Sequence, residues 1–287
     1  METILIIGGT GNIGYPLIEA LTKKENVNLV VGAHNVENTK KKLAHFDQLE
    51  VKAFDFLDAS TYETCLKGID RLFFVRPPEL SKPKEDMFPF LEKVKLLQIK
   101  QVVFVSLIGV EKNPMTPHNK IEKKIEALNL PYTFIRPSFF MQNLNTTHLE
   151  DIRDYHDLFV PAGKALTSFI DTRDIGAVAA VCLSEEKYIG RKLEITGAKA
   201  ISYYQAAEIM SEVLGVPISY SRPSLWKFRK VMLRRGIPKN FVNVMIMLYF
   251  ITQLGNAKKV THVAEEILNR EPISFAKYVA DNKEQFL

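Results

Sequence analysis

Thr3-Ile4-Leu5-Ile6-Ile7-Gly8-Gly9-Thr10-Gly11-Asn12-Ile13-Gly14, near the start of the chain, decides the fold. A run of strand-forming residues leads directly into the glycines, and a helical pattern begins near Tyr15 and Pro16. The glycines have the spacing of a dinucleotide-binding turn, where the backbone approaches phosphates and the following helix N-terminus supplies unpaired N–H groups. The predicted pyrophosphate-binding residues are Gly8, Gly9, Thr10, Gly11, Asn12, Ile13 and Gly14.

Strand-like and helical patterns alternate after this turn as far as residue 137. Predicted strands are Thr3–Ile7, Leu29–Gly32, Val51–Phe54, Arg71–Val75, Gln101–Ser106 and Tyr132–Arg136. Predicted helices are Tyr15–Lys24, Asn38–Phe46, Ser60–Leu66, Asp86–Leu97 and Pro117–Leu128, with Ser60 and Glu63 read as a capping box. Several strands are apolar throughout, which is typical of strands covered on both faces. The fold class is therefore α/β, a Rossmann-type doubly wound parallel sheet.

The alternation becomes irregular in the second half. Short strands are predicted near Ser168–Asp171 and Lys192–Thr196, and helices at Asp174–Leu183, Tyr203–Leu214, Leu225–Arg235 and Lys239–Leu254. We expect residues 1–140 to form the NAD(P)-binding domain. Residues 141–287 should form a smaller, mostly helical cap over the carboxyl edge of the sheet, with some segments returning to the sheet.

Composition excludes several classes of protein. The chain has 287 residues, 46% hydrophobic and 25% charged, with a formal net charge of +5, which is ordinary globular composition. The basic residues look scattered, so no nucleic-acid partner is expected. Cys65 and Cys182 have no neighbouring Cys or His pattern, so neither a metal site nor a disulfide is expected, and a reducing, cytoplasmic location fits.

No targeting or membrane-spanning segment is expected. The start of the chain lacks a basic region, and glycines soon interrupt its apolar run, which argues against a signal peptide. The longest apolar stretch, Phe241–Leu254, is shorter than the roughly 20 residues that a membrane helix needs, and it contains Asn243, Thr252 and Gln253. We interpret it as a buried or groove-lining helix.

The end of the second strand bears on the choice of cofactor. An acidic residue normally stands there and binds the adenosine ribose of NAD. Here residues 30–35 read Val-Val-Gly-Ala-His-Asn, with no carboxylate, which favours NADP and leaves NAD as the alternative. His34 and Lys40 can face a 2′-phosphate, although Lys40 equally suits a solvated helix start.

The chain resembles the NmrA-like family of atypical short-chain dehydrogenases, and particularly its quinone oxidoreductase-like members. The order and spacing of seven motifs carry this resemblance. They are Gly8–Gly14, Asp55–Asp58, Phe73–Pro78, Phe104–Gly109, His118–Glu122, Leu130–Pro137 and Asp171–Ile175.

The resemblance implies roles for individual residues. Asp55 and Phe56 would cover the adenine, and Val75, Arg76 and Pro77 would pass beside the nicotinamide ribose. Further cofactor-binding residues would be Ser106, Pro137, Ser138 and Phe139. The acceptor would meet Leu107, Phe140, Met141 and Asn143, under a roof formed by Val242–Phe250. Core packing is the alternative reading for Phe139, Phe140 and Met141.

The chain departs from short-chain dehydrogenases at the catalytic pair. The positions of their Tyr-x-x-x-Lys motif hold Pro114 and His118 here, so the usual tyrosine acid is missing. His118 is the candidate proton donor, and the alternatives are contact with the nicotinamide ribose or amide, or an inert surface residue.

These observations favour an NAD(P)H-dependent reductase that passes hydride to a conjugated, largely apolar small molecule such as a quinone. Such an acceptor delocalises the added charge, so a site without tyrosine suffices. The alternative is a redox-sensing regulator that binds NAD(P) without turnover, as some members of the family do. The sequence is compatible with a homo-oligomer.

Overall fold

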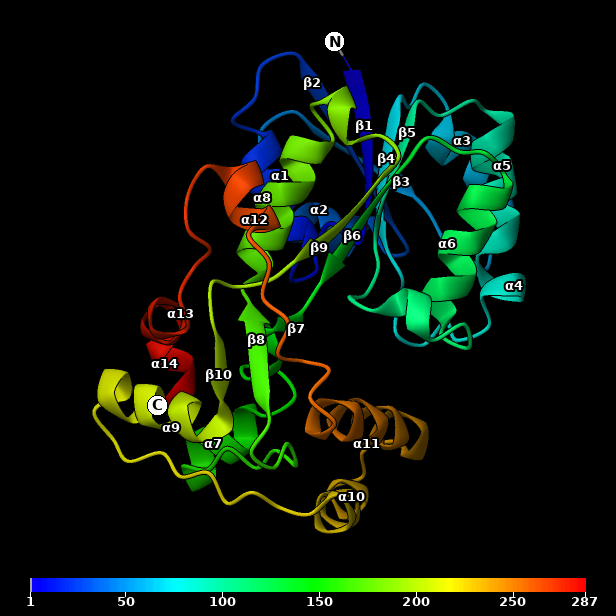
Figure 1. Cartoon of the computed structure of the whole chain (residues 1–287). Coiled ribbons are helices and arrows are strands. Elements are labelled where there is room, and N and C mark those ends of the chain that lie inside the picture. The colour runs from blue at the N-terminus through cyan, green and yellow to red at the C-terminus, as the bar shows by residue number, and fades with distance from the viewer. Residues whose placement is uncertain (1) are drawn as a thin grey trace. The chain divides into compact units, whose positions relative to one another are not determined.

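The computed structural model describes residues 2–287, which divide into two compact units (Figure 1). The first unit takes in the chain as far as Pro137 and then Thr172–Ile195. The second consists of Ser138–Asp171 and Thr196–Leu287. Each unit is therefore built from two separate stretches of chain.

A seven-stranded parallel sheet forms the centre of the first unit, in the order β3-β2-β1-β4-β5-β6-β9. The strands are β1 (Glu2–Ile7), β2 (Val27–Ala33), β3 (Leu49–Ala53), β4 (Arg71–Val75), β5 (Gln101–Val105), β6 (Tyr132–Pro137) and β9 (Arg191–Ile195). The strand order reverses beside β1, the position where open α/β sheets bind ligands. The predicted Rossmann fold class is confirmed.

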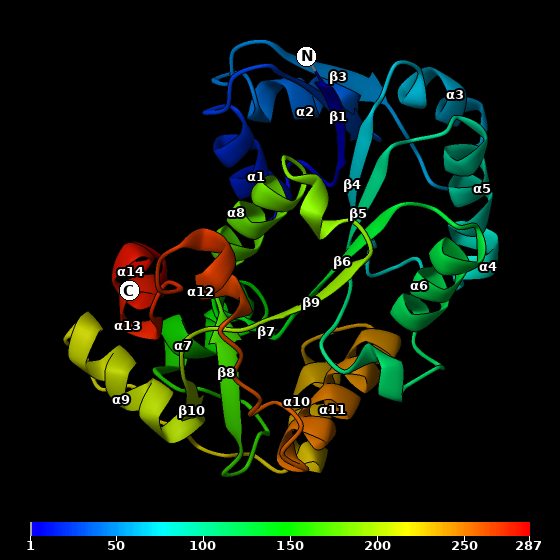
Figure 2. The ribbon, with the colours of Figure 1, turned by 45° about the horizontal axis from the view of Figure 1, so that its top comes forward.

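Helices cover both faces of this sheet. They are α1 (Gly14–Leu21), α2 (Val36–Lys42), α3 (Ser60–Leu66), α4 (Pro83–Asp86), α5 (Phe88–Leu96), α6 (Pro117–Ala127) and α8 (Thr172–Cys182), with the short 3-10 turns η1 (Val110–Lys112) and η3 (Glu186–Tyr188). Helices α3, α5 and α6 lie on one face, and α1 and α8 lie side by side on the other (Figures 1 and 2). All five residues of β5 are buried, as its unbroken apolar run predicts.

A glycine allows α8 to pack tightly against α1. A Cβ at Gly176 would lie 2.8 Å from the backbone nitrogen of Leu17 and 2.9 Å from Cβ of Pro16. A larger side chain would therefore push the two helices apart. Helix α8 comes after β6 in the chain. A segment far along the sequence therefore packs against α1, the helix that begins at the glycine turn.

The predicted capping box at Ser60 and Glu63 is wrong. The N-cap of α3 is Ala59, and no side chain caps the helix. Ser60 lies one residue inside, where its N–H and hydroxyl donate to Oδ1 of Asp58 at 3.0 and 2.7 Å. Glu63 instead accepts from Lys93 at 2.8 Å. Asp58, just before the helix, thus accepts the hydrogen bond from the Ser60 N–H that the sequence assigned to Glu63.

The second unit has a small mixed sheet in the order β10-β8-β7, surrounded by helices. Its strands are β7 (Phe139–Phe140), β8 (Leu166–Ile170) and β10 (Ala200–Ser202). Its helices are α7 (Leu149–Tyr155), α9 (Tyr203–Leu214), α10 (Leu225–Arg234), α11 (Lys239–Gln253), α12 (Val263–Leu268), α13 (Phe275–Asp281) and α14 (Lys283–Phe286), with the 3-10 turn η2 (Met141–Asn143).

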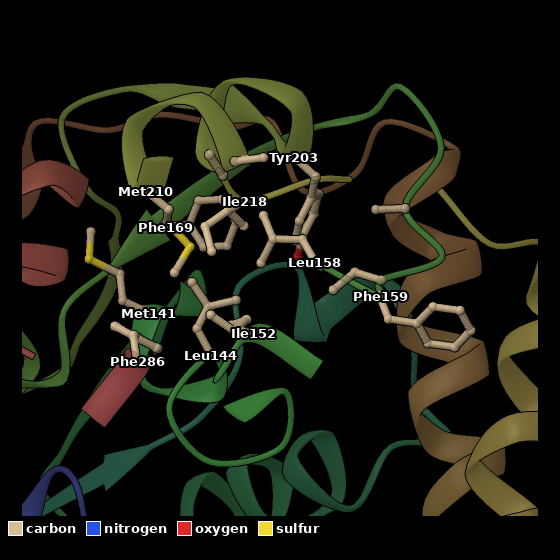
Figure 3. Close-up of a cluster of buried hydrophobic side chains, with 14 of the residues drawn as sticks. Met141, Leu144, Ile152, Leu158, Phe159, Phe169, Tyr203, Met210, Ile218 and Phe286 are labelled. Carbon is tan, nitrogen blue, oxygen red and sulfur yellow. The ribbon is translucent and has the colours of Figure 1, made fainter. Parts of the chain in front are cut away.

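This unit has its own hydrophobic core. Figure 3 shows Phe169 of β8 and Tyr203 of α9 packed with side chains from the loops and from α7. A capping box at Ser202 and Gln205 fixes the start of α9. No helix within residues 2–287 is long and apolar enough to cross a bilayer.

Candidate functional site

The glycine turn joins β1 to α1 through backbone hydrogen bonds. The N–H of Gly11 donates to the carbonyl of Gly8 at 3.0 Å, and the N–H of Tyr15 donates to the carbonyl of Gly11 at 3.0 Å. Gly8 has φ +90°, a left-handed value that suits glycine. Ile13 precedes α1 without a side-chain cap, so no side chain takes up the N–H groups of the first helical turn.

The turn fits a dinucleotide pyrophosphate. A Cβ at Gly14 would lie 2.2 Å from the Gly8 carbonyl oxygen, and one at Gly9 would lie 2.9 Å from Cγ1 of Val31. Those two positions need glycine for the turn itself. Gly11 is exposed, and its added Cβ would lie 3.3 Å from the same oxygen. The bare backbone at Gly11 therefore leaves room for an anion at the helix N-terminus.

A pocket of about 600 Å³ lies beside this turn, within the first unit. It lies at the carboxyl ends of β1 to β4 and takes in Gly8, Gly9, Thr10, His34, Asp55, Phe56 and Pro77 of the predicted set. Sequence reasoning missed the remaining lining residues, Ile7, Val31, Gly32, Ala33, Asn35, Asn38, Thr39, Phe54, Leu57, Glu79 and Leu80. The sequence does predict that strands end near Gly32 and Phe54. Because the carboxyl ends of neighbouring parallel strands lie at one edge of the sheet, these residues could have been expected beside the glycine turn.

His34 and Asp55 meet at the rim of the pocket. Nδ1 of His34 lies 3.0 Å from Oδ2 of Asp55, and the imidazole is 84% exposed. The other carboxylate oxygen of Asp55 accepts from the N–H of Leu57 at 2.8 Å. Asp55 thus orders the turn after β3 while it orients the ring of His34.

Two asparagines also border the pocket, together with the acidic residue Glu79. Asn35 caps α2, since its Oδ1 accepts from the N–H of Asn38 at 2.9 Å, and both side chains border the pocket. Of the described residues that line the pocket, none is Lys or Arg. Lys40 is outside the lining, 4.0 Å from Glu37, and it lies in the last turn of α2 and not at a helix start.

Arg76 shapes the loop after β4. Its Nη1 donates to the carbonyls of Pro77 at 2.7 Å, Leu80 at 2.8 Å and Pro78 at 3.1 Å. Burial lowers the pKa of the guanidinium. The side chain therefore holds Pro77 and Leu80 where they line the pocket, a role that sequence reasoning did not anticipate. Val75, which precedes it, is half-buried at the end of β4.

Ser106 and Leu107 follow β5 at the same edge of the sheet. Ser106 is 1% exposed, and its N–H donates to the carbonyl of Ile135 at 2.7 Å. Its Oγ has no hydrogen-bond partner among the described residues. A buried hydroxyl without a partner is unfavourable, which makes Ser106 a good candidate for a ligand contact. Leu107 is half-buried.

His118 lies in the first turn of α6, stacked on Phe104 of β5. The ring centroids are 5.9 Å apart, with 23° between the planes. Burial, followed by the positive charge of Arg76, lowers the pKa of His118 to about 3. The imidazole is neutral at physiological pH, so a cationic imidazolium is not available as a proton donor.

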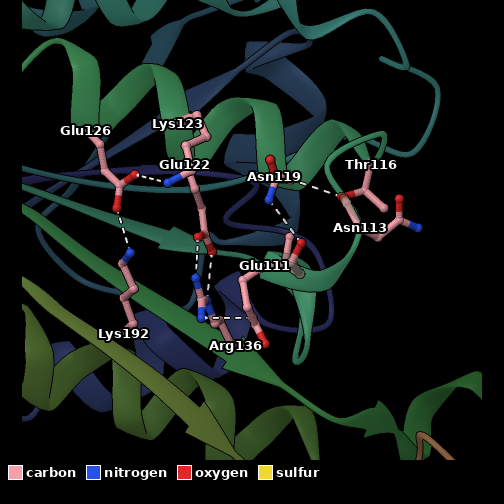
Figure 4. A network of polar contacts seen from close by, with 10 residues as sticks. Glu111, Asn113, Thr116, Asn119, Glu122, Lys123, Glu126, Arg136 and Lys192 are labelled. Carbon is pink, nitrogen blue, oxygen red and sulfur yellow. Dashed lines mark hydrogen bonds and ion pairs between the residues drawn. The ribbon is translucent and has the colours of Figure 1, made fainter.

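A buried ion-pair network fixes the helix that carries His118 (Figure 4). Arg136 of β6 donates to both carboxylate oxygens of Glu122, at 2.6 and 3.0 Å, and to Glu111 at 3.2 Å. Asn119 donates to the carbonyl of Val110 at 3.0 Å. Both Glu122 and Arg136 lie in the motifs that carry the family resemblance. This ion pair gives a structural role to the glutamate and the arginine of those motifs.

The remaining predicted residues follow β6 in the chain. Pro137 ends that strand, and Ser138 begins the second unit with a buried Oγ that lacks a partner among the described residues. Phe139 packs against Phe169 and Tyr249, with ring centroids 6.0 and 5.9 Å away.

Met141 is only 2% exposed, in the core of the second unit. Met141 is therefore a core residue, as in the alternative interpretation, and we no longer expect it to contact the acceptor. Phe140 and Asn143 are half-buried. In the predicted roof, Val242, Met245 and Tyr249 point into the same core.

Comparison with known proteins adds to this description. The chain is 30% identical over 280 residues to prestalk A differentiation protein A of Dictyostelium discoideum, covering 97% of this chain and 92% of that protein. It is 25% identical over 283 residues to an NAD(P)H azoreductase of Xenophilus azovorans, covering 96% of each. The structure resembles that of an NADPH-dependent quinone oxidoreductase from Escherichia coli in complex with NADPH. Their TM-score is 0.87 at 19% identity, over 97% of this chain and 99% of that one. The model of the NmrA-like family matches residues 1–279, and the chain therefore belongs to that family.

Proposed function

We propose that this protein is an NAD(P)H-dependent reductase that transfers hydride to a conjugated, largely apolar acceptor such as a quinone. The glycine turn and its adjoining pocket carry the proposal, because they offer backbone N–H groups and nucleotide-sized space at the switch point of the sheet. The azoreductase and quinone oxidoreductase relatives support a reductase.

NADP is the proposed cofactor, with NAD as the alternative. The glycine turn would bind the pyrophosphate, and Asp55 with Phe56 would border the adenine. Asn35 and Asn38 would donate hydrogen bonds to a 2′-phosphate, which His34 would face. The carboxylate of Asp55 at the same rim already pairs with His34 and would repel a 2′-phosphate. We therefore expect only a small preference for NADP over NAD.

The bound cofactor supplies a hydride. In this proposal Ser106 offers a buried hydroxyl to the nicotinamide, and Leu107 borders the acceptor. Contacts of Ser138 with the cofactor and of Phe140 with the acceptor remain predictions from the family resemblance. Hydride addition to a quinone gives a delocalised oxyanion that takes its proton from water. The neutral state of His118 agrees with such an acceptor, because no strong protein acid is required.

Steady-state oxidation of NADPH with a panel of quinones, enones, azo dyes and simple ketones tests the proposal. We expect turnover with a quinone and none with simple ketones, which need a proton donor for the alkoxide. Reduction of ketones at comparable kcat/KM would contradict the proposed acceptor class.

The second candidate is a cofactor-sensing regulator without turnover. The low pKa of His118 and the missing tyrosine favour it, because together they leave no evident protein acid. Tight NADPH binding in calorimetry without oxidation by any acceptor would support this alternative.

We place the protein in the reducing cytoplasm. Cys65 and Cys182 are free, buried thiols, and burial raises the pKa of each to about 12, so neither is reactive.

Light scattering of the cofactor-bound protein would measure whether it forms a homo-oligomer.

A further inference from the structure

The positive charge of the chain is concentrated in one segment of the second unit. Between Val213 and Ala264 there are nine Lys and Arg residues and no Asp or Glu. The net charge of the whole chain is +5, so the rest of the protein is net negative. The expectation that basic residues are scattered is therefore wrong. They are Arg222, Lys227, Arg229, Lys230, Arg234, Arg235, Lys239, Lys258 and Lys259.

Helix α10 presents several of these charges on its solvent face. Phe228 and Met232 are buried, whereas Trp226 is 75% exposed. Trp226, Arg229, Lys230, Leu233 and Arg234 recur at helical spacing and line a shallow depression of about 340 Å³. Nζ of Lys230 lies 5.9 Å from the centre of the Trp226 ring. The outer face of α10 is therefore both basic and apolar.

Helix α11 packs beside α10 (Figures 1 and 2), and it exposes several large apolar side chains. Val242, Met245 and Tyr249 point into the core. Five large apolar side chains on other faces of the helix are exposed, namely Phe241, Val244, Met247, Leu248 and Phe250, and Leu254 directly after the helix is exposed as well. An exposed apolar surface of this kind is expected to be covered by something other than water.

We propose that α10 and α11 dock this protein peripherally onto an anionic phospholipid bilayer. Basic side chains interspersed with tryptophan and aliphatic residues are the pattern of helices that lie in the bilayer interface. Lys and Arg bind the lipid phosphates, while Trp226 and the exposed side chains of α11 enter the acyl boundary.

Lipid suits this surface better than the other polyanions. A nucleic-acid backbone would pair with the basic residues but would leave Val244, Met247 and Leu248 in water. Helix α10 carries Lys and Arg but no Asp or Glu, which matches a negatively charged surface. A folded protein partner usually presents both signs of charge.

The experiment uses full-length protein loaded with NADPH. Sedimentation with vesicles of phosphatidylcholine is compared with sedimentation with mixed phosphatidylcholine and phosphatidylserine vesicles. We expect binding only to the anionic vesicles and weaker binding at high salt. Trp226 is the only tryptophan in the chain, so its emission reports directly on the surface and should shift to the blue on binding.

Substitutions on α10 separate this proposal from non-specific attraction. The double variant Lys230→Glu with Arg234→Glu should weaken vesicle binding at least about tenfold. The matched control is Lys23→Glu with Lys24→Glu, on exposed residues of the first unit, and it should bind like the wild type. Circular dichroism checks that both variants are folded.

Three outcomes would overturn the proposal. They are equal binding to neutral vesicles, equal loss in the two double variants, and unchanged Trp226 emission on anionic vesicles. Tighter binding to a DNA duplex or to an acidic protein than to vesicles would assign the surface to that partner instead. None of these readouts depends on turnover, so the docking proposal stands or falls separately from the reductase.

Discussion

The imidazole of His118 is stacked on the ring of Phe104, with centroids 5.9 Å apart. Burial lowers the pKa of His118 to about 3, so its ring is neutral at pH 7. His118→Ala should therefore lower the maximal rate with a quinone only modestly, well below the roughly 10²–10⁴-fold loss of a required general acid. Stopped-flow or steady-state kinetics at saturating NADPH measures this. A collapse of the rate would make His118 the catalytic acid.

Phe140 should matter more than His118 for turnover. Its half-buried ring follows Ser138 and is proposed to orient the acceptor. Phe140→Ala should lower kcat by up to about 10²-fold, because misplacement of the acceptor by about 1 Å can cost that much. Phe140→Leu keeps an apolar wall and should recover part of the rate. Near wild-type kinetics for Phe140→Ala would remove this residue from the acceptor site.

Two glycines of the turn should respond differently to substitution. Gly11→Val should abolish NADPH binding in calorimetry and leave the protein folded, because its side chain points to the open side of the turn. Gly14→Ala should lower the melting temperature instead, since its Cβ would lie 2.2 Å from the carbonyl oxygen of Gly8. Unchanged cofactor affinity in Gly11→Val would refute the assignment of the pyrophosphate site.

His34 should influence whether the protein binds NADP or NAD more tightly. We expect NADP to raise the melting temperature at least as much as NAD at equal concentration. His34→Arg should widen that difference, because a guanidinium pairs with both the 2′-phosphate and Asp55. Lys40→Ala, outside the pocket lining, is the matched control and should change neither value. A larger shift with NAD in the wild type would contradict this reading of the rim.

The stability of the protein should fall in mild acid partly because of His148. This ring is buried, its Nε2 lies 2.6 Å from the hydroxyl of Tyr249, and burial lowers its pKa to about 4. The unfolded chain takes up the proton near pH 6.5, so stability is lost as pH falls from there towards 4. The loss attributable to His148 should reach about 3 kcal/mol at pH 4.

Urea unfolding at several pH values measures this loss. His148→Phe should flatten the pH dependence between 6.5 and 4, whereas His262→Gln, on an exposed residue, should leave it unchanged. Equal slopes for the wild type and His148→Phe would show that His148 is not the titrating group.

The sequence predicts those features that depend on local chemistry. The glycines at 8–14 and the apolar run of β5 require no knowledge of distant residues, and both lie where expected. Features that depend on tertiary contacts could not be predicted. The low pKa of His118 comes from its burial over Phe104, and Arg76 serves the loop after β4 only because that loop folds around it. The N-cap of α3 is Ala59 instead of Ser60, and Ser60 instead donates to Asp58.

The first unit is built from two stretches of chain that are synthesised at different times, so its parts cannot all fold at once. Strand β9 pairs with β6, and α8 packs on α1 through Gly176, yet Ser138–Asp171 is made in between. While the ribosome is still adding that insertion, one face of α1 has no partner and the edge of β6 is open. The glycine turn thus leaves the ribosome long before Ile195, and it gains its full support only after that residue has followed.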